Sequence, residues 1–120
     1  MIKRSEMQKI ASEYTDPKIG VLGSHSALEI MDGAKDEDFE TVVYCQKGRE
    51  VPYQRFNRIA DEIKILKKFK DMASPANQKI MRENNTIIIP HRSLTAYLGY
   101  DILENKLKVP IFGNRKLFQA

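Results

Sequence analysis

Short apolar segments alternate with amphipathic helical segments along most of the chain, and this alternation constrains the fold more than any other feature. The apolar segments lie at residues 18–22, 39–45, 61–66, 86–90 and 109–112, and several are rich in the β-branched residues typical of strands. The helical segments place apolar residues three and four positions apart, so that one face of each can be buried. Repeated strand–helix units predict an α/β fold: a mostly parallel, five-stranded sheet with helices on both faces.

Local signals predict where the helices lie. The apolar spacing places helices at residues 5–14, 24–35, 75–83, 93–98 and 102–106, with a helical turn near 53–57. Ser5 and Asp101 are the predicted N-caps of the first and last of these helices. Gly33 lies inside the second helix, where glycine costs about 1 kcal/mol relative to alanine, so close packing against the sheet is the predicted reason for it.

Two of the strands have contrasting patterns. The segment 86–90 is the most apolar, which predicts a position at the centre of the sheet. The segment 61–66 alternates charged and apolar side chains, as a half-exposed edge strand does. The basic segment 67–70 that follows it is predicted to be a solvated, charged edge.

Length and composition limit the classes of protein that remain. A chain of 120 residues with 42% hydrophobic and 30% charged residues suits one globular domain at 17–120, preceded by an amphipathic helix at 1–16. The net charge of +4 suits an anionic ligand, and because the basic residues are scattered we expect no nucleic-acid partner. No segment is apolar and long enough to predict a membrane span or a signal peptide. A single cysteine predicts no internal disulfide and suits a reducing cytoplasm, and one cysteine with two histidines predicts no zinc site.

Two loops carry the candidate binding residues. Ser24, His25 and Ser26 follow the first strand, and Arg92 and Ser93 follow the strand at 86–90. In the sheet order 3-2-1-4-5 these strands are neighbours, and both loops then lie at the edge of the sheet where ligands bind. Helix N-termini at this edge favour a phosphate, so the pattern predicts a site for a phosphorylated small molecule. In the alternative interpretation the serines are only N-caps and the histidines of the two loops are solvent-exposed.

A third loop follows the second strand at the same edge. Lys47, Arg49 and Tyr53 could reach an anionic ligand from it, although a basic surface loop explains the same residues equally well. Cys45 is predicted to be a core residue. The dinucleotide fingerprint, the Walker loop and the nucleophile elbow are absent from the sequence, and no pair of carboxylates suggests a metal site. We therefore predict no catalytic residue and no metal ligand in this chain, which leaves half of a site.

The sequence resembles the archaeal formate-dependent ligases of purine biosynthesis, which convert 5-aminoimidazole-4-carboxamide ribotide to its formamido product with formate and ATP. The resemblance covers nearly the whole chain after the first helix. It is carried by the segments 23–28, 32–35, 39–42, 47–49, 52–53, 55–56, 89–93, 96–100, 104–105 and 109–115.

The resemblance implies a Rossmann-like pre-ATP-grasp domain whose ATP-grasp region, in cis or in trans, is absent from this chain. It also implies that His25 and Ser93 bind the ribotide, whereas the role of Arg92 stays open because some relatives have glycine there. ATP and magnesium or manganese are expected to bind mainly outside this chain, where formate becomes formyl phosphate and the ribotide amine attacks the formyl carbon. This domain alone is expected to be inactive, and homo-oligomerisation is left open. A stand-alone nucleotide-binding or regulatory module of flavodoxin-like topology is the alternative function.

Overall fold

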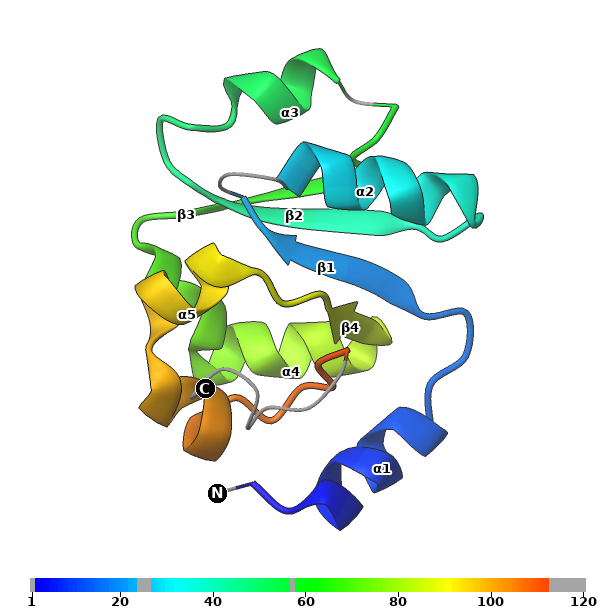
Figure 1. The fold of residues 1–120 in the computed structure, drawn as a ribbon, viewed down its shortest axis with the longest axis vertical. Helices are drawn as coiled ribbons and strands as arrows, with labels where there is room; N and C mark the ends of the chain where they lie inside the picture. The colour runs from blue at the N-terminus through cyan, green and yellow to red at the C-terminus, as the bar shows by residue number, and fades with distance from the viewer. Residues whose placement is uncertain (1, 24–26, 57, 113–120) are drawn as a thin grey trace.

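In the part of the chain that the structure describes, four parallel strands form the sheet, in the order β3-β2-β1-β4 (Figure 1). The computed structural model describes residues 2–23, 27–56 and 58–112. The strands are β1 (Lys18–Leu22), β2 (Thr41–Gln46), β3 (Glu62–Leu66) and β4 (Thr86–Ile88). In the register, Gly20 of β1 pairs with Val42 on one side and with Ile88 on the other. The predicted strand order is confirmed for these four strands, and β3 is the predicted edge strand.

Helices cover both faces of the sheet, as predicted. They are α1 (Arg4–Ser12), α2 (Ala27–Asp36), α3 (Val51–Arg55), α4 (Pro75–Glu83), α5 (Arg92–Leu98), the 3-10 helix η1 (Phe69–Ala73) and the π-helix η2 (Ile102–Lys106). In Figure 1, α2 and α3 lie on one side of the sheet, whereas α4 and α5 lie on the other. Parallel strands need such crossover helices, which leave both faces of the sheet buried.

The segment 109–112 does not form the predicted fifth strand. Its contact with β4 is a single parallel bridge between Ile88 and Ile111. The Ile88 N–H donates to the Pro110 carbonyl at 2.9 Å, and the Phe112 N–H donates to the Ile88 carbonyl at 2.9 Å. Proline has no N–H to continue a ladder, so the segment lies where a fifth strand would lie but does not extend into one.

The prediction that residues 86–90 form the centre of the sheet is wrong. The centre is formed by β1 and β2, while β4 has three residues and lies outside β1. The apolar run at 86–90 is explained by burial of β4 rather than by a central position. Ile88 is fully buried, and the bridge to Ile111 covers the edge of β4 that faces away from β1.

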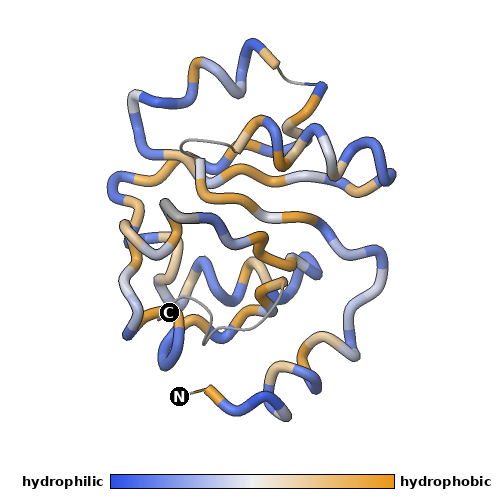
Figure 2. Tube along the Cα trace, in the orientation of Figure 1, coloured by the Kyte–Doolittle hydropathy of each residue, from blue (hydrophilic) through white to orange (hydrophobic). Residues whose placement is uncertain are grey.

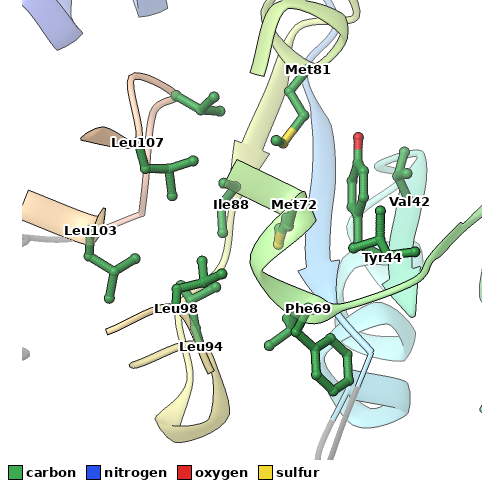
Figure 3. Close-up of a cluster of buried hydrophobic side chains, with 13 residues drawn as sticks. Val42, Tyr44, Phe69, Met72, Met81, Ile88, Leu94, Leu98, Leu103 and Leu107 are labelled. Atoms are coloured by element: carbon green, nitrogen blue, oxygen red, sulfur yellow. The ribbon is translucent and has the colours of Figure 1, made fainter. Parts of the chain in front are cut away.

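Two hydrophobic cores lie on opposite faces of the sheet. The core on the α4 and α5 side contains Leu22, Val42, Tyr44, Leu66, Phe69, Met72, Met81, Ile88, Leu94, Leu98, Leu103, Leu107 and Val109 (Figure 3). The core on the α2 side contains Ile19, Val21, Ala27, Met31, Val43, Cys45, Tyr53 and Ala60. Figure 2 shows hydrophobic colour along much of the strands in the interior and polar colour on many of the outer turns and loops.

Phe69 corrects the prediction of a solvated segment at 67–70. Its side chain is buried, and its ring lies 4.3 Å from that of Tyr97 between centroids. One aromatic residue therefore anchors η1 and α5 to each other within an otherwise basic segment.

Close packing against a glycine occurs in β1 and not at Gly33 of α2, where it is predicted. A Cβ on Gly20 would lie 2.6 Å from Thr86 Cγ2, so close packing requires glycine in β1. A Cβ on Gly33 would meet nothing within 4 Å, so close packing does not explain that residue. The predicted N-caps Ser5 and Asp101 are also wrong. Lys3 occupies the N-cap position of α1, and the Asp101 side chain makes no cap hydrogen bond to η2.

Candidate functional site

The carboxyl ends of β1 and β4 meet at one edge of the sheet. Beyond the last register pair, the Ile89 N–H donates to the Gly20 carbonyl at 3.0 Å. The chain leaves β1 toward β2 on one side, whereas β4 lies on the other side, so the strand order reverses between β1 and β4. Ligands of open parallel sheets bind in the crevice at such a reversal. We call residues 22–23 and 89–91 the β1–β4 junction.

His91 connects the two sides of the β1–β4 junction. Its Nε2 lies 3.0 Å from the carbonyl oxygen of Leu22, a residue 69 positions earlier in the chain. Since a carbonyl oxygen only accepts, Nε2 carries the proton and donates. Burial lowers the pKa of His91 below its usual value, and the hydrogen bond to Leu22 offsets part of that shift. The ring is therefore neutral at pH 7.

Gly23 directs the chain out of β1. Its N–H donates to the Tyr44 carbonyl at 2.7 Å, which extends the pairing with β2 beyond Leu22. A Cβ at Gly23 would lie 2.8 Å from Cys45 Cβ and 3.0 Å from Val43 Cγ2. Glycine is thus required where the chain passes from β1 toward α2, which begins at the buried Ala27.

The predicted binding residues are only partly described. Ser24, His25 and Ser26 lie outside the described residues. Arg92 and Ser93 are the first two residues of α5, and their side chains also lie outside the description. The structure does bring together the residues that precede the two loops. Leu22 and Gly23 precede the first loop, and His91, whose side chain contacts the Leu22 carbonyl, precedes Arg92 and Ser93. The roles of all five side chains stay predictions.

Lys47 and Arg49 follow β2 and are exposed. The Lys47 N–H donates to the Leu66 carbonyl at 2.7 Å, which places this loop beside the end of β3. Gly48 has a φ of +96°, and its N–H donates to Glu50 Oε2 at 2.6 Å, so a tight turn separates the two cations. The loop lies at the predicted edge of the sheet, on the side of β2 that faces away from β4.

Tyr53 corrects the prediction for this loop. Its side chain is buried in the core on the α2 side rather than directed toward a ligand. Burial raises the pKa of its hydroxyl, and the neighbouring Cys45 adds to that shift. Cys45 is a buried core residue, as predicted, and burial raises the pKa of its thiol.

The link between His91 and Leu22 was not predicted. The sequence signal was limited to a histidine directly after a proline at the end of an apolar strand, and nothing local indicates the distant backbone atom that it contacts. Only the strand order, once known, places the two within reach.

The described residues offer neither a metal-binding cluster nor a membrane-spanning helix. Within the described ranges, no group of three or more His, Cys, Asp or Glu side chains is arranged to hold a metal ion. Among those same residues, every helix is too short or too polar to cross a membrane.

Comparison with known proteins gives consistent matches. Residues 19–120 match a family described as a protein of unknown function, DUF1246. The chain is 46% identical over 121 residues to the 5-formaminoimidazole-4-carboxamide-1-(beta)-D-ribofuranosyl 5'-monophosphate synthetase of Methanopyrus kandleri, an alignment that covers 99% of this chain and 33% of that protein. It is 47% identical over 120 residues to the synthetase of the same name from Methanothermobacter thermautotrophicus, with 98% and 33% covered.

The fold has a solved counterpart. A crystal structure described as an IMP biosynthesis protein PurP from Thermococcus kodakaraensis matches with a TM-score of 0.65 and 32% sequence identity, over 82% of this chain and 30% of that chain. The chain spans about a third of the length of the curated relatives that it matches. Because the family match extends over most of its residues, from the first strand onward, the chain belongs to the DUF1246 family.

Proposed function

We propose that this chain is the ribotide-binding domain of an ATP- and formate-dependent ligase of purine biosynthesis. In this proposal the whole protein formylates 5-aminoimidazole-4-carboxamide ribotide on the way to IMP, and the present domain binds the ribotide. His25 and Ser93 contact the ribotide, with Ser24, Ser26, Arg92, Lys47 and Arg49 as further candidate contacts.

The observation that carries the proposal is the β1–β4 junction. The hydrogen bond from His91 to the Leu22 carbonyl, at 3.0 Å, holds the ends of two strands together. The loops that continue from these ends contain His25 and Ser93, so one ligand between α2 and α5 can be contacted from both. The names of the relatives, which share 46% and 47% of their residues with this chain over the aligned part, support a ribotide as that ligand.

Within the ranges that the structure describes, no group of three or more His, Cys, Asp or Glu side chains is arranged to hold a metal ion. Magnesium usually binds through one or two carboxylates together with the phosphates of a bound nucleotide, and no pair of carboxylates in the sequence suggests such a site. We therefore assign ATP, formate and magnesium or manganese mainly to an ATP-grasp region of the whole protein. The contribution of this domain is to hold the ribotide in place for attack, which is a proximity effect.

The proposed setting is an archaeal cytoplasm. The buried free thiol of Cys45 suits a reducing compartment, and the curated relatives named above come from methanogenic organisms. A homo-oligomer is compatible with this function.

Calorimetric titration tests the proposal. The protein is titrated with 5-aminoimidazole-4-carboxamide ribotide, AMP and FMN, and we expect binding of the ribotide in preference to the other two. His25→Ala and Ser93→Ala should each raise the ribotide Kd by about tenfold or more, because each removes a polar contact to a charged ligand.

The matched control is Ser5→Ala, since Ser5 is exposed on α1 and makes no cap. Equal ribotide affinity in the unsubstituted protein and in both site variants would contradict the site. Tighter binding of AMP or FMN would instead favour a stand-alone nucleotide-binding module.

A further inference from the structure

His91 lies beyond the last register pair of the β1–β4 ladder. The pairs run from Lys18 with Thr86 to Gly20 with Ile88. The His91 side chain contacts β1 two residues further on, at the Leu22 carbonyl. A side chain therefore continues the connection between the strands past the backbone ladder, directly before the two candidate loops in the sequence.

The surroundings of His91 fix the geometry of this contact. Pro90 precedes it, and the pyrrolidine ring restricts the backbone that leads to the imidazole. The ring is partly buried, and burial lowers its pKa, so it remains in the neutral form with the proton on Nε2. The Leu22 side chain is fully buried, which anchors the residue whose carbonyl accepts the bond.

We propose that His91 is a positioning residue that holds the loops after β1 and β4 in register, so that both contact one ribotide. This inference rests on the proposed function. Ligand groups displaced by about 1 Å can cost about 100-fold in rate. The bond sets the relative position of the strand ends by linking residues 69 positions apart.

Two amide variants separate the hydrogen bond from the ring. The amide nitrogen of glutamine occupies nearly the position of Nε2, whereas that of asparagine corresponds to Nδ1. We expect His91→Gln to restore the bond to Leu22 and to keep the ribotide affinity close to that of the unsubstituted protein. We expect His91→Asn and His91→Leu to raise the ribotide Kd by about tenfold or more, because the loops lose their common position.

The matched control is Ala96→Gln, which adds the same amide to the exposed face of α5.

In the full-length ligase, the KM for the ribotide should rise more than kcat falls in His91→Asn, because the reacting groups themselves are unchanged. A general base would behave differently: kcat/KM would fall as pH falls through the pKa of His91, and His91→Gln would be as impaired as His91→Leu. That result overturns the positioning role.

Nitrogen-15 NMR of the imidazole measures the bond without any ligand. We expect a neutral ring protonated at Nε2 at pH 7, and a ring protonated at Nδ1 would overturn the inference. Ribotide that binds the unsubstituted protein and all three variants equally would also overturn it. Ribotide that fails to bind even the unsubstituted protein is instead a failure of the proposed function.

Thermal unfolding of each variant is measured alongside binding. If His91→Leu does not fold, the ribotide affinities of His91→Gln and His91→Asn still test the positioning role. If neither amide variant folds, His91 is required for folding and the positioning role is overturned.

Discussion

Gln78 is a buried polar side chain of α4 that makes three hydrogen bonds to backbone atoms. Its Nε2 donates to the carbonyls of Ala73 at 2.7 Å and Lys106 at 3.0 Å, and its Oε1 accepts from the Lys108 N–H at 3.0 Å. One side chain thus provides hydrogen-bond partners for backbone groups at the end of η1, at the end of η2 and just after η2. Backbone groups that are shielded from water are costly to leave without a partner.

We expect Gln78→Leu to lower the free energy of unfolding by about 2–4 kcal/mol, because three part-buried backbone groups lose their partner. Urea unfolding followed by circular dichroism measures the change. Gln54→Leu, at an exposed position of α3, is the control and should change stability by less than about 0.5 kcal/mol. A loss of similar size in both variants would contradict this role of Gln78.

The two glycines Gly20 and Gly33 give opposite expectations for the same substitution. Gly20→Ala would bring a Cβ to 2.6 Å from Thr86 Cγ2 and should destabilise the sheet by about 1–3 kcal/mol. Thr86→Ser removes that methyl group, so the double variant should recover part of the loss. Gly33→Ala meets nothing within 4 Å in α2 and should stabilise by about 0.5–1 kcal/mol. Thermal unfolding of Gly20→Ala, Thr86→Ser, the double variant and Gly33→Ala, each compared with the unsubstituted protein, checks these expectations. A loss of stability in Gly33→Ala would refute the open packing around Gly33.

At the scale of elements, one carboxylate joins α2, β2 and the start of β3. Asp61 Oδ2 accepts from the Thr41 N–H at 2.8 Å and from Lys35 Nζ at 2.6 Å. Thr41 is fully buried, and its hydroxyl donates to the Ile59 carbonyl and accepts from the Asp61 N–H at 3.2 Å. These contacts lie at the amino ends of β2 and β3, opposite the edge that carries the candidate site.

This cluster predicts a dependence of stability on pH. Burial alone would raise the pKa of Asp61, but the bonds from Lys35 and Thr41 outweigh it and hold the pKa below its usual value. The folded state therefore binds fewer protons, and the stabilisation is present above the unfolded pKa of about 3.9 and is lost as pH falls through the lower folded value.

We expect Asp61→Asn to be less stable than the unsubstituted protein at pH 7, with a difference that shrinks as the pH is lowered below about 4. Urea unfolding at several pH values gives the comparison. Asp36→Asn, at the exposed end of α2, is the control. A difference that stays constant across this range would show that the charge of Asp61 does not contribute.

At the scale of the whole molecule, the features predicted well depend on local sequence. The helix α4 is an example: Ser74 precedes Pro75 and its hydroxyl accepts the Asn77 N–H at 3.2 Å, as an N-cap does. The order of the strands could also be anticipated from the sequence, because right-handed crossovers between strand–helix units allow few arrangements of the strands in the sheet.

The features that were missed depend on contacts between distant residues. The burial of Phe69 depends on Tyr97, and the bond of His91 depends on Leu22; neither partner lies nearby in sequence. The predictions of close packing at Gly33 and of a strand at 109–112 failed for the same reason, since the spacing alone does not show that the close contact lies between Gly20 and Thr86 or that Pro110 interrupts a fifth strand. For the candidate site, sequence reasoning placed the ends of β1 and β4 at one edge of the sheet, as the structure does, but it did not identify the His91 side chain that links them.

The distance along the chain between Leu22 and His91 also bears on the order of protein synthesis. β1 leaves the ribosome first and can pair with β2 soon afterwards, but its other neighbour, β4, is made much later, and the bond between Leu22 and His91 spans 69 residues. Until then the Leu22 carbonyl has no imidazole to accept from. The nascent chain can therefore form its central pair of strands before the β1–β4 junction, which forms only once β4 has been made.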